Sequence, residues 1–433
     1  MRLPSLTLAV VVGLGMASSS APRAQDPSAE LANRIQAVMP KVIEWRRDVH
    51  QHPELSNREV RTAALVAAHL KALGLEVQTG VARTGVVGVL RGGRPGPVVA
   101  LRADMDALPV TEQGDLPFRS TVRSTYDGQD VGVMHACGHD AHVAMLMGVA
   151  EVLAGVRARL PGTVKFIFQP AEEGPPPGET GGARQMVIEG VLDNPKVDAI
   201  FGLHVMPLEN GTLWTRSGGL MASSDTVKIT VRGKQTHGAA PWDGVDPVVV
   251  SAQIITALQT IVSRQVDLTA APAVVTIGRI NGGVRFNIVP DSVVLEGTIR
   301  ALDRAVQRDL HARVKRTAEA VAASAGATAE VSFDIDTAPI TYNDPALTTR
   351  MTPTLRRVSD QRLFEARPRT LAEDFSRFQE KVPGMFFYLG VNRPGVDPAT
   401  VAANHSPLFH VDESALPVGV RALATLAVDY LTQ

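Results

Sequence analysis

The chain has 433 residues, of which 45% are hydrophobic and 20% are charged, so it is long enough to bury a large core in two or three domains. Its 43 Lys and Arg residues balance 44 Asp and Glu residues. Such a balance gives no net field to attract nucleic acid or an anionic membrane surface. We therefore expect no nucleic acid and no membrane among its partners.

The first residues are typical of an export signal. Arg2 precedes an apolar run over residues 6–16, small residues follow over 17–21, and a polar stretch begins at Gln25. The alternative, a membrane anchor, needs about 20 apolar residues, and this run is shorter. No other segment is typical of a membrane span. The sequence predicts a signal peptide over residues 1–24 and a periplasmic or secreted protein.

Helices and buried strands alternate after this leader. Apolar spacing predicts a helix over residues 29–47 and another from Ser56, with Glu59 completing a capping box and Gly74 ending the helix. A further helix is predicted over 142–160. Short continuous apolar runs predict strands buried on both faces, at 86–90, 97–102, 163–168, 197–203 and 385–391. This order indicates an α/β fold with a central sheet flanked by helices.

The order of predicted strands and helices changes between residues 220 and 336. Successive patterns predict a strand, a helix, two strands, a helix and a strand, at 226–231, 247–265, 273–280, 292–300, 305–323 and 329–335. The order β-α-β-β-α-β is that of ferredoxin-like domains. We expect this domain to be inserted into the first one, which would comprise residues 25–219 and 337–433 and end in a helix over 414–431.

Polar side chains follow three of the predicted strands. Asp104 and Asp106 follow the second, Glu172 and Glu173 follow the third, and His204 follows the fourth. Ligands of open α/β sheets bind beyond the carboxyl ends of the strands. One carboxylate of the Glu172–Glu173 pair can bind a metal while the other takes a proton from water. The alternative is that both are solvated surface acids, but their place after an apolar strand favours a site.

The only cysteine, Cys137, lies close to His139 and His142 where a helix is expected to begin. A disulfide within the chain is impossible, and a closed structural zinc site would need a second nearby cysteine. The pattern fits a mixed metal site completed by distant histidine and carboxylate groups. The alternative is a buried inert thiol. His405, in a loop before the last helix, is either a further ligand or a loop histidine.

Seven motifs resemble one known family. The chain is similar to the hippurate hydrolase and auxin-conjugate (indole-acetyl-amino-acid) hydrolase branch of the metallo-aminoacylase and carboxypeptidase family, metallopeptidase family twenty, subfamily D. The resemblance runs from residue 50 to residue 407. It rests on ALRADMDALP at 100–109, MHACGHDAH at 134–142, QPAEE at 169–173, GLHV at 202–205, GKQTHGAAP at 233–241, GGVRFNIVPD at 282–291 and AEDFS at 372–376.

The resemblance implies a zinc-peptidase-like catalytic domain with a mixed sheet and an inserted lid that also forms a homodimer. It implies two divalent ions, zinc or manganese, with cobalt or nickel also compatible. The implied metal ligands are Cys137, His139, Glu173, His204 and His405. Glu172 would be the general base and later the general acid. Asp106 would hold a ligand histidine in position.

The resemblance also implies roles for lid residues. His237 would reach the scissile carbonyl, often from the partner subunit, while Arg285 and Asn287 would hold the substrate carboxylate or carbonyl. Alone, His237 reads as a surface histidine. Asp104 has no assigned role, because related branches carry a metal-binding histidine there. The remaining histidines are interpreted as packing residues or supports of the site: His50, His52 and His142.

The implied activity is metal-dependent hydrolysis of N-acyl amino acids to a carboxylic acid and a free amino acid. The substrate would be a small molecule with a free carboxylate. An alternative is a carboxypeptidase or dipeptidase on the same scaffold, which comparison of hippurate-type substrates with dipeptides would separate. An alternative of a different class, a periplasmic binding protein or an inactive homologue, is disfavoured by the intact Glu172 and ligand positions.

Overall fold

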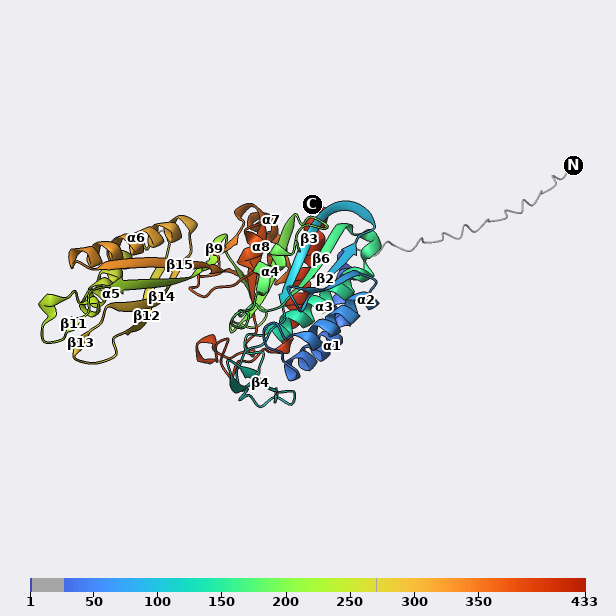
Figure 1. Ribbon diagram of the computed structural model, residues 1–433. Helices are drawn as coiled ribbons and strands as arrows, with labels where there is room; N and C mark the ends of the chain where they lie inside the picture. The colour runs from blue at the N-terminus through green and yellow to red at the C-terminus, as the bar shows by residue number, and fades with distance from the viewer. Residues whose placement is uncertain (2–26, 270) are drawn as a thin grey trace.

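The structure is a computed structural model that describes residues 1, 27–269 and 271–433. Nearly all of the predicted signal peptide lies outside the described residues, so that assignment stays a prediction. Figure 1 shows two parts of the chain, a larger one built around a long sheet and a smaller one that extends to one side.

An eight-stranded sheet, in the order β1-β2-β6-β3-β7-β18-β8-β17, forms the centre of the larger part. Its four middle strands, from β6 to β18, run parallel, whereas β2 is antiparallel to β6 and β8 is antiparallel to β18. The strands are β1 (Glu76–Val81), β2 (Gly85–Arg91), β3 (Arg94–Asp104), β6 (Pro161–Gln169), β7 (Ala199–Met206), β8 (Leu213–Thr215), β17 (Leu363–Glu365) and β18 (Gly384–Gly390). The predicted mixed sheet is confirmed.

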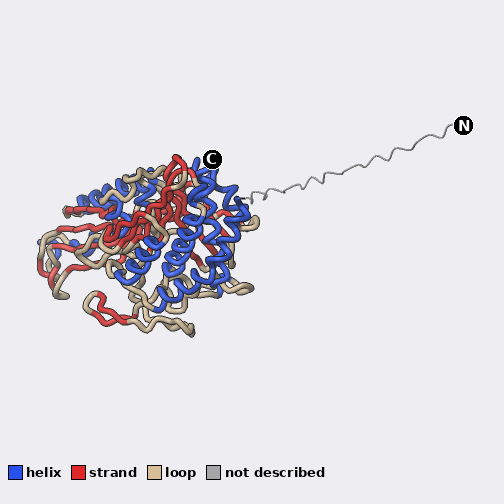
Figure 2. The backbone as a smooth tube through the Cα atoms, turned by 90° about the vertical axis from the view of Figure 1, so that its right-hand side faces the viewer, coloured by secondary structure: helices blue, strands red, loops and turns tan. Residues whose placement is uncertain are grey.

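Both faces of this sheet are buried, because successive side chains of a strand point to opposite sides. On β3, Val99 and Leu101 join the larger apolar cluster and Ala100 joins the smaller one on the other face. Figure 2 shows helices gathered on one side of the strands. The larger cluster is formed with α1 (Pro27–Gln51), α2 (Val60–Ala72), α3 (His139–Gly155), α7 (Pro345–Val358) and α9 (Leu416–Thr432), and the smaller with α4 (Gly182–Ile188) and α8 (Ser376–Gln379).

The smaller part is a four-stranded antiparallel sheet in the order β12-β14-β10-β15. Its elements follow one another as β10 (Ser224–Arg232), α5 (Pro247–Arg264), β12 (Ala273–Gly282), β14 (Ser292–Ala301), α6 (Arg304–Ser324) and β15 (Thr328–Ala338). Val227, Ile229 and Val231 are buried in a cluster with both helices, whereas the alternating residues Thr226 and Lys228 are exposed. Two helices therefore cover one face of a sheet whose other face meets water.

Short ladders mark the two ends of the smaller part. Where the chain enters and leaves it, β9 (Gly218–Met221) pairs with β16 (Thr341–Asn343). At the far end, β11 (Thr236–His237) pairs with β13 (Ile288–Val289). A separate hairpin, β4 (Arg123–Tyr126) with β5 (Gln129–Gly132), projects from the larger part (Figure 1).

The predicted capping box at the start of α2 is wrong. The Ser56 hydroxyl donates to Asp106 at 2.7 Å, and the Glu59 carboxylate accepts from Ala171 and Thr84 instead of its own helix. The amides of the first turn of α2 donate to Glu54, five residues earlier than Glu59. The sequence has the capping-box pattern, but Ser56 and Glu59 form hydrogen bonds with residues outside the helix instead.

The start of one further helix differs from the prediction, and β1 and α7 are among the elements that were not predicted. Helix α3 begins at His139 instead of residue 142. The edge strand β1 was missed because its side chains are mostly exposed and show no apolar run. Helix α7 was missed as well, and Pro353 lies inside it.

Two helices, α5 and α9, are long and apolar enough to cross a membrane by length and composition, so the expectation that no segment after the leader could do so is wrong by this criterion. Helix α9 packs against α3, α7 and β3, and α5 packs against α6 and β12. Apolar helices that pack inside a folded protein meet the same criterion.

Candidate metal centre

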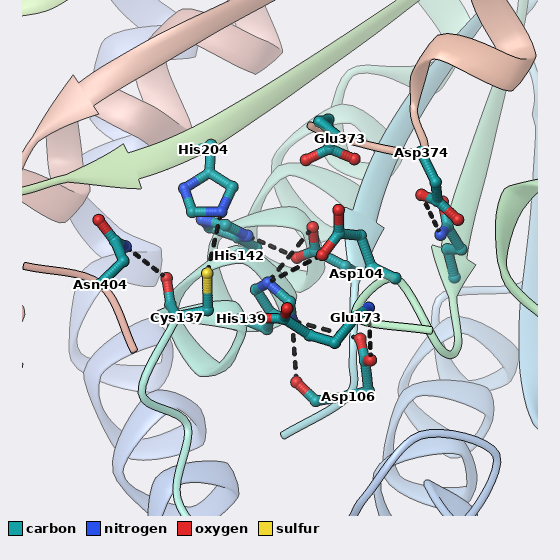
Figure 3. Close-up of polar contacts among 12 residues, drawn as sticks. Asp104, Asp106, Cys137, His139, His142, Glu173, His204, Glu373, Asp374 and Asn404 are labelled. Carbon is teal, nitrogen blue, oxygen red and sulfur yellow. Dashed lines mark hydrogen bonds and ion pairs between the residues drawn. The ribbon is translucent and has the colours of Figure 1, made fainter. Parts of the chain in front are cut away.

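The carboxyl ends of β3, β6 and β7 lie side by side and carry the polar groups of the site (Figure 3). Asp104 is the last residue of β3, Glu172 and Glu173 follow β6, and His204 lies near the end of β7. Cys137 and His139 come from the start of α3. His405 reaches the same place from the loop before α9, because its backbone amide donates to Ala136 at 2.8 Å.

The five residues expected as metal ligands form two groups that share one sulfur atom. Cys137, His139 and His204 offer donor atoms within 4.8 Å of one another, and so do Cys137, Glu173 and His405. Two overlapping groups with a common thiolate are what a pair of neighbouring ions would require. All five side chains therefore come together from four separate stretches of the chain.

The ring of His139 is oriented with one bare nitrogen toward this cluster. Nδ1 donates to the backbone carbonyl of Asp106 at 2.8 Å, and the Asp106 carboxylate lies 3.3 Å from the same nitrogen. Nε2 is buried and has no hydrogen-bond partner among the described residues. A buried nitrogen without a partner is costly unless something occupies its lone pair, and a metal ion would do so.

The ring of His204 is also oriented by a hydrogen bond from Nδ1, which leaves Nε2 directed toward the cluster. Its Nδ1 donates to the carbonyl of Val205 at 2.8 Å, so Nε2 faces the Cys137 sulfur at 3.3 Å. His142 supports this strand end without being a ligand: its Nε2 accepts from the Val205 amide at 2.8 Å, and its Nδ1 donates to Asp104 at 2.5 Å. Both nitrogens of His142 are therefore used, and Asp104 serves to orient it.

Gly138 permits the turn between the two ligands Cys137 and His139. Its φ is 93°, and a Cβ placed there would lie 2.3 Å from a methyl carbon of Val205. Only glycine takes this conformation without strain. Across the site, Asn404 donates to the carbonyls of Cys137 and Val205, which fixes the loop that carries His405 (Figure 3).

Glu173 and His405 form the more open side of the cluster. Their side chains are 14% and 54% exposed, and the carboxylate lies 3.1 Å from Nε2 of His405. The hydrogen bond with Glu173 raises the pKa of His405. The backbone amide of Glu173 donates to Asp106 at 3.0 Å, so Asp106 contacts two of the five expected ligands.

The cluster holds more negative than positive charge. Arg102, buried on β3, bonds to Asp104, Glu373 and Asp374 at 2.6 to 3.1 Å. Three further carboxylates lie close by, and each of them faces a histidine ring instead of a guanidinium group. They are Asp106, Glu172 and Glu173.

The pKa shifts of these groups reflect the same surplus of negative charge. Burial raises the pKa of Glu172 well above its ordinary value, and the carboxylates of Glu373, Glu173 and Asp374 raise it further. Burial would lower the pKa of His139, but Asp104 and Asp106 raise it to about 10. Buried charges require compensation, and divalent cations among these donors would supply it. The residues present therefore fit a metal centre.

A cavity of about 760 Å³ opens from this cluster toward the smaller part. Glu172 lines it together with four of the five expected ligands, Cys137, Glu173, His204 and His405. Arg300 and Ser224 contribute from the smaller part. Its apolar wall includes Met206 and Met221. The cavity is large enough for a small organic substrate beside the metal centre.

The three residues expected from the lid are not brought to this cavity. His237 lies in the β11–β13 ladder at the far end of the smaller part, and Arg285 and Asn287 lie in the loop before β13 (Figure 1). None of them lines the cavity among the described residues. Within one chain, the structure separates this group from the metal centre.

Comparison with known proteins identifies the family. The sequence profile of peptidase family M20/M25/M40 matches residues 100–429, which include every expected metal ligand and Glu172. The chain belongs to peptidase family M20/M25/M40. The resemblance found in the motifs is thereby confirmed, and so is the predicted class of enzyme, a metal-dependent hydrolase of amide bonds.

Two similar proteins are named after different kinds of hydrolase. The chain is 42% identical to Thermostable carboxypeptidase 2 of Saccharolobus solfataricus, over 93% of this chain and 98% of that protein. It is 37% identical to IAA-amino acid hydrolase ILR1-like 2 of Arabidopsis thaliana, over 100% of this chain and 96% of that protein.

A solved M20 structure shares the whole architecture. The YXEP protein of Bacillus subtilis, described as a dinuclear metal-binding peptidase, is 36% identical and has a TM-score of 0.77. The match covers 92% of this chain and 99% of that one. The fold is therefore that of an M20 peptidase.

Three supports of this M20 site were not found from the sequence. Arg102 could have been noticed as a charge inside an apolar strand, and Glu373 and Asp374 lie in a motif that was quoted without a role. Two further histidines lie away from the cluster: His50 bonds to Asp140 and Glu112, and the exposed His52 bonds to the backbone of the preceding helix, α1.

Proposed function

We propose that this enzyme hydrolyses N-acyl amino acids, hippurate-like or related conjugates, to a carboxylic acid and a free amino acid. The observation that carries the proposal is the pair of donor groups sharing Cys137, with Glu172 beside them in the same cavity. The whole-length similarity to a protein named IAA-amino acid hydrolase supports an acyl amide as substrate.

Two divalent ions would occupy the two donor groups. Cys137, His139 and His204 would hold one ion, and Cys137, Glu173 and His405 the other. A thiolate and three imidazoles suit zinc, while manganese, cobalt and nickel also fit mixed nitrogen, oxygen and sulfur donors. When bound, such ions acidify water and polarise a carbonyl. The similar dinuclear peptidase supports the number of ions.

Glu172 would act as the general base. Its side chain is 9% exposed, and one carboxylate oxygen lies 3.9 Å from Nε2 of His139. Burial raises the pKa of Glu172, so its carboxylate has a high affinity for the proton of the attacking water. It would then return that proton to the leaving nitrogen of the amino acid.

Substitution of Glu172 by Gln tests this role. The variant should bind the same amount of metal as the wild type but turn over N-acyl amino acids about 100- to 10,000-fold more slowly. Metal content by elemental analysis and product release by mass spectrometry measure the two effects. Near-normal turnover in Glu172→Gln would exclude Glu172 as the base.

Hydrolysis of small peptides is the second candidate function. It is favoured by the 42% identity to a protein named Thermostable carboxypeptidase 2. Both activities break an amide next to a free carboxylate, so the metal centre does not separate them. Metal-loaded enzyme should be assayed with matched pairs, such as hippurate and a dipeptide that both end in glycine. Preference for the dipeptide would replace the first proposal by the second.

A second copy of the chain would complete the site. In the neutral form of His237, Nδ1 accepts from the Ala239 amide at 2.9 Å, so Nε2 carries the proton and can donate to an oxyanion. Val284 and Phe286, in the same end of the smaller part, are 98% and 96% exposed. Apolar side chains so exposed support association of two copies there.

Subunit complementation tests this arrangement. His237→Ala and Glu172→Gln should each be nearly inactive alone. If His237 acts in its partner's site, co-refolded mixtures should regain up to a quarter of wild-type activity, because a mixed dimer contains one intact composite site. Absence of recovery, with mixed dimers shown by native mass spectrometry, would place His237 in its own chain's site.

Export to the periplasm or the medium is proposed from the apolar leader. The charged, apolar and small-residue segments over 1–24 support it. Expression in a Gram-negative host, followed by fractionation and N-terminal sequencing, tests it. A cytoplasmic protein that keeps its leader would contradict the proposal.

A further inference from the structure

The carboxylate of Glu59 is fully buried at the start of α2 but bonds away from that helix. Oε1 accepts from the amides of Asn57 at 3.0 Å and Ala171 at 2.9 Å, and Oε2 accepts from the Thr84 hydroxyl at 2.5 Å. The helix does not need Glu59 as a cap, because Glu54 accepts from the amides of its first turn at 2.8 Å.

The contact with Ala171 falls on an unusual backbone position. Ala171 has a φ of 52°, in the left-handed region that residues with a Cβ rarely adopt. It directly precedes Glu172 and Glu173, after the end of β6. A residue in this conformation persists only where its surroundings hold it, and such residues gather at functional sites.

The short segment 171–173 is fixed at both of its ends by buried carboxylates. Glu59 accepts from the amide of Ala171, and Asp106 accepts from the amide of Glu173 at 3.0 Å. Asp106 is held in turn by the Ser56 hydroxyl, from the same stretch as Glu59. Glu172 lies between the two anchors and enters the cavity.

We propose that Glu59 is a positioning residue for the metal centre, which holds the left-handed turn at Ala171 and thereby directs Glu173 toward Cys137 and His405. Glu59 itself does not line the cavity. The inference rests on the proposed metal centre, and it predicts an asymmetric effect. Loss of Glu59 disturbs the donor group that contains Glu173 and leaves Cys137, His139 and His204 in place.

The test uses the full chain reconstituted with Co²⁺, with bound cobalt counted by elemental analysis and the thiolate-to-cobalt absorption recorded. In Glu59→Ala the affinity for one of the two ions should fall about 10- to 100-fold. The thiolate absorption should persist, because the other ion keeps Cys137 as a ligand. Glu59→Gln retains an oxygen acceptor for Ala171 and should bind two ions.

Two further variants keep the test decisive. Glu54→Ala removes the caps of α2 without touching segment 171–173, so it should lower stability but bind two ions. If Glu59→Ala does not fold, Glu59→Asp keeps a buried carboxyl group but is too short for the Ala171 contact, and it should show the same loss of one ion.

Three outcomes would overturn the proposal. The first is a wild-type affinity for both ions in the soluble Ala or Asp variant. The second is an equal loss of one ion in Glu54→Ala, because that would trace the effect to the stability of α2. The third is failure of the wild-type chain to bind cobalt at all, which would refute the proposed metal centre. The wild-type control distinguishes this outcome from the other two.

Discussion

The sulfur of Cys137 lies 3.3 Å from Nε2 of His204, although 67 positions separate the two residues in the chain. The contact joins the start of α3 to the end of β7. Cys137 belongs to both donor groups, whereas His204 belongs to one and His405 to the other.

Loss of the shared sulfur should affect both ions. Cys137→Ala is expected to reduce bound metal from about two ions to well below one per chain, because each donor group loses a ligand. His405→Ala, which removes a ligand from one group, should retain about one ion. Elemental analysis after dialysis measures both. Equal metal content in the two variants would contradict a bridging role for Cys137.

His142 should support metal binding without being a ligand. His142→Phe removes the acceptor of the Val205 amide and one of the two hydrogen-bond partners of Asp104, so His204 loses its orientation. We expect metal affinity to fall about 10- to 100-fold while the number of ions stays the same. Titration against a chelator measures the affinity. His52→Phe, on an exposed histidine, is the control and should bind as the wild type does.

Arg102 should be among the residues most important for stability. Arg102→Met leaves Asp104, Glu373 and Asp374 buried without their cation, which costs about 3–5 kcal/mol. Thermal unfolding of the metal-free protein measures the loss. Arg91→Met, which breaks an exposed pair with Glu76 in the same sheet, should leave the unfolding midpoint unchanged. Similar losses in the two variants would contradict the account.

The stability of the metal-free protein should fall in acid partly through Asp140. Burial would raise the pKa of Asp140, but the Arg46 guanidinium and His50 hold it well below its usual range. The folded state therefore binds fewer protons than the unfolded state below about pH 4, so this stabilisation is complete above that pH and is lost as the pH falls.

Asp140→Asn isolates this contribution. It should be about 1–3 kcal/mol less stable at pH 7, because the buried Arg46 loses its nearer carboxylate partner and keeps only a longer contact with Glu413. The free energy of unfolding, measured by urea titration with chelator present, should then fall less steeply than that of the wild type below pH 4. Parallel curves for the two proteins would exclude Asp140 as the titrating group.

Much of the larger part could be predicted from local sequence. Strands such as β6 and β7 appear as continuous apolar runs because both faces of the sheet are covered, and the polar residues that follow them mark its carboxyl edge. Strand β1 was not predicted, because an exposed edge strand has no run of apolar residues. Local patterns therefore reveal burial, and they fail where burial is absent.

The roles of individual polar residues depended on contacts across the fold. Ser56 and Glu59 match a helix cap in the sequence, yet one bonds to Asp106 and the other to Ala171. His142 resembles a ligand by its spacing from His139, and only its bonds to Asp104 and Val205 show that both nitrogens are occupied. A hydrogen bond depends on distance and direction, which spacing along the chain does not specify.

By itself, the sequence determined the chemistry that is available: one thiol, three histidines and a pair of adjacent glutamates in motifs of an M20 peptidase. The tertiary structure alone decided which nitrogen of each ring is bare, that Cys137 belongs to two donor groups, and that His237 lies far from both. The physical reason is that residue types set which bonds can form, whereas packing of distant segments sets which atoms meet.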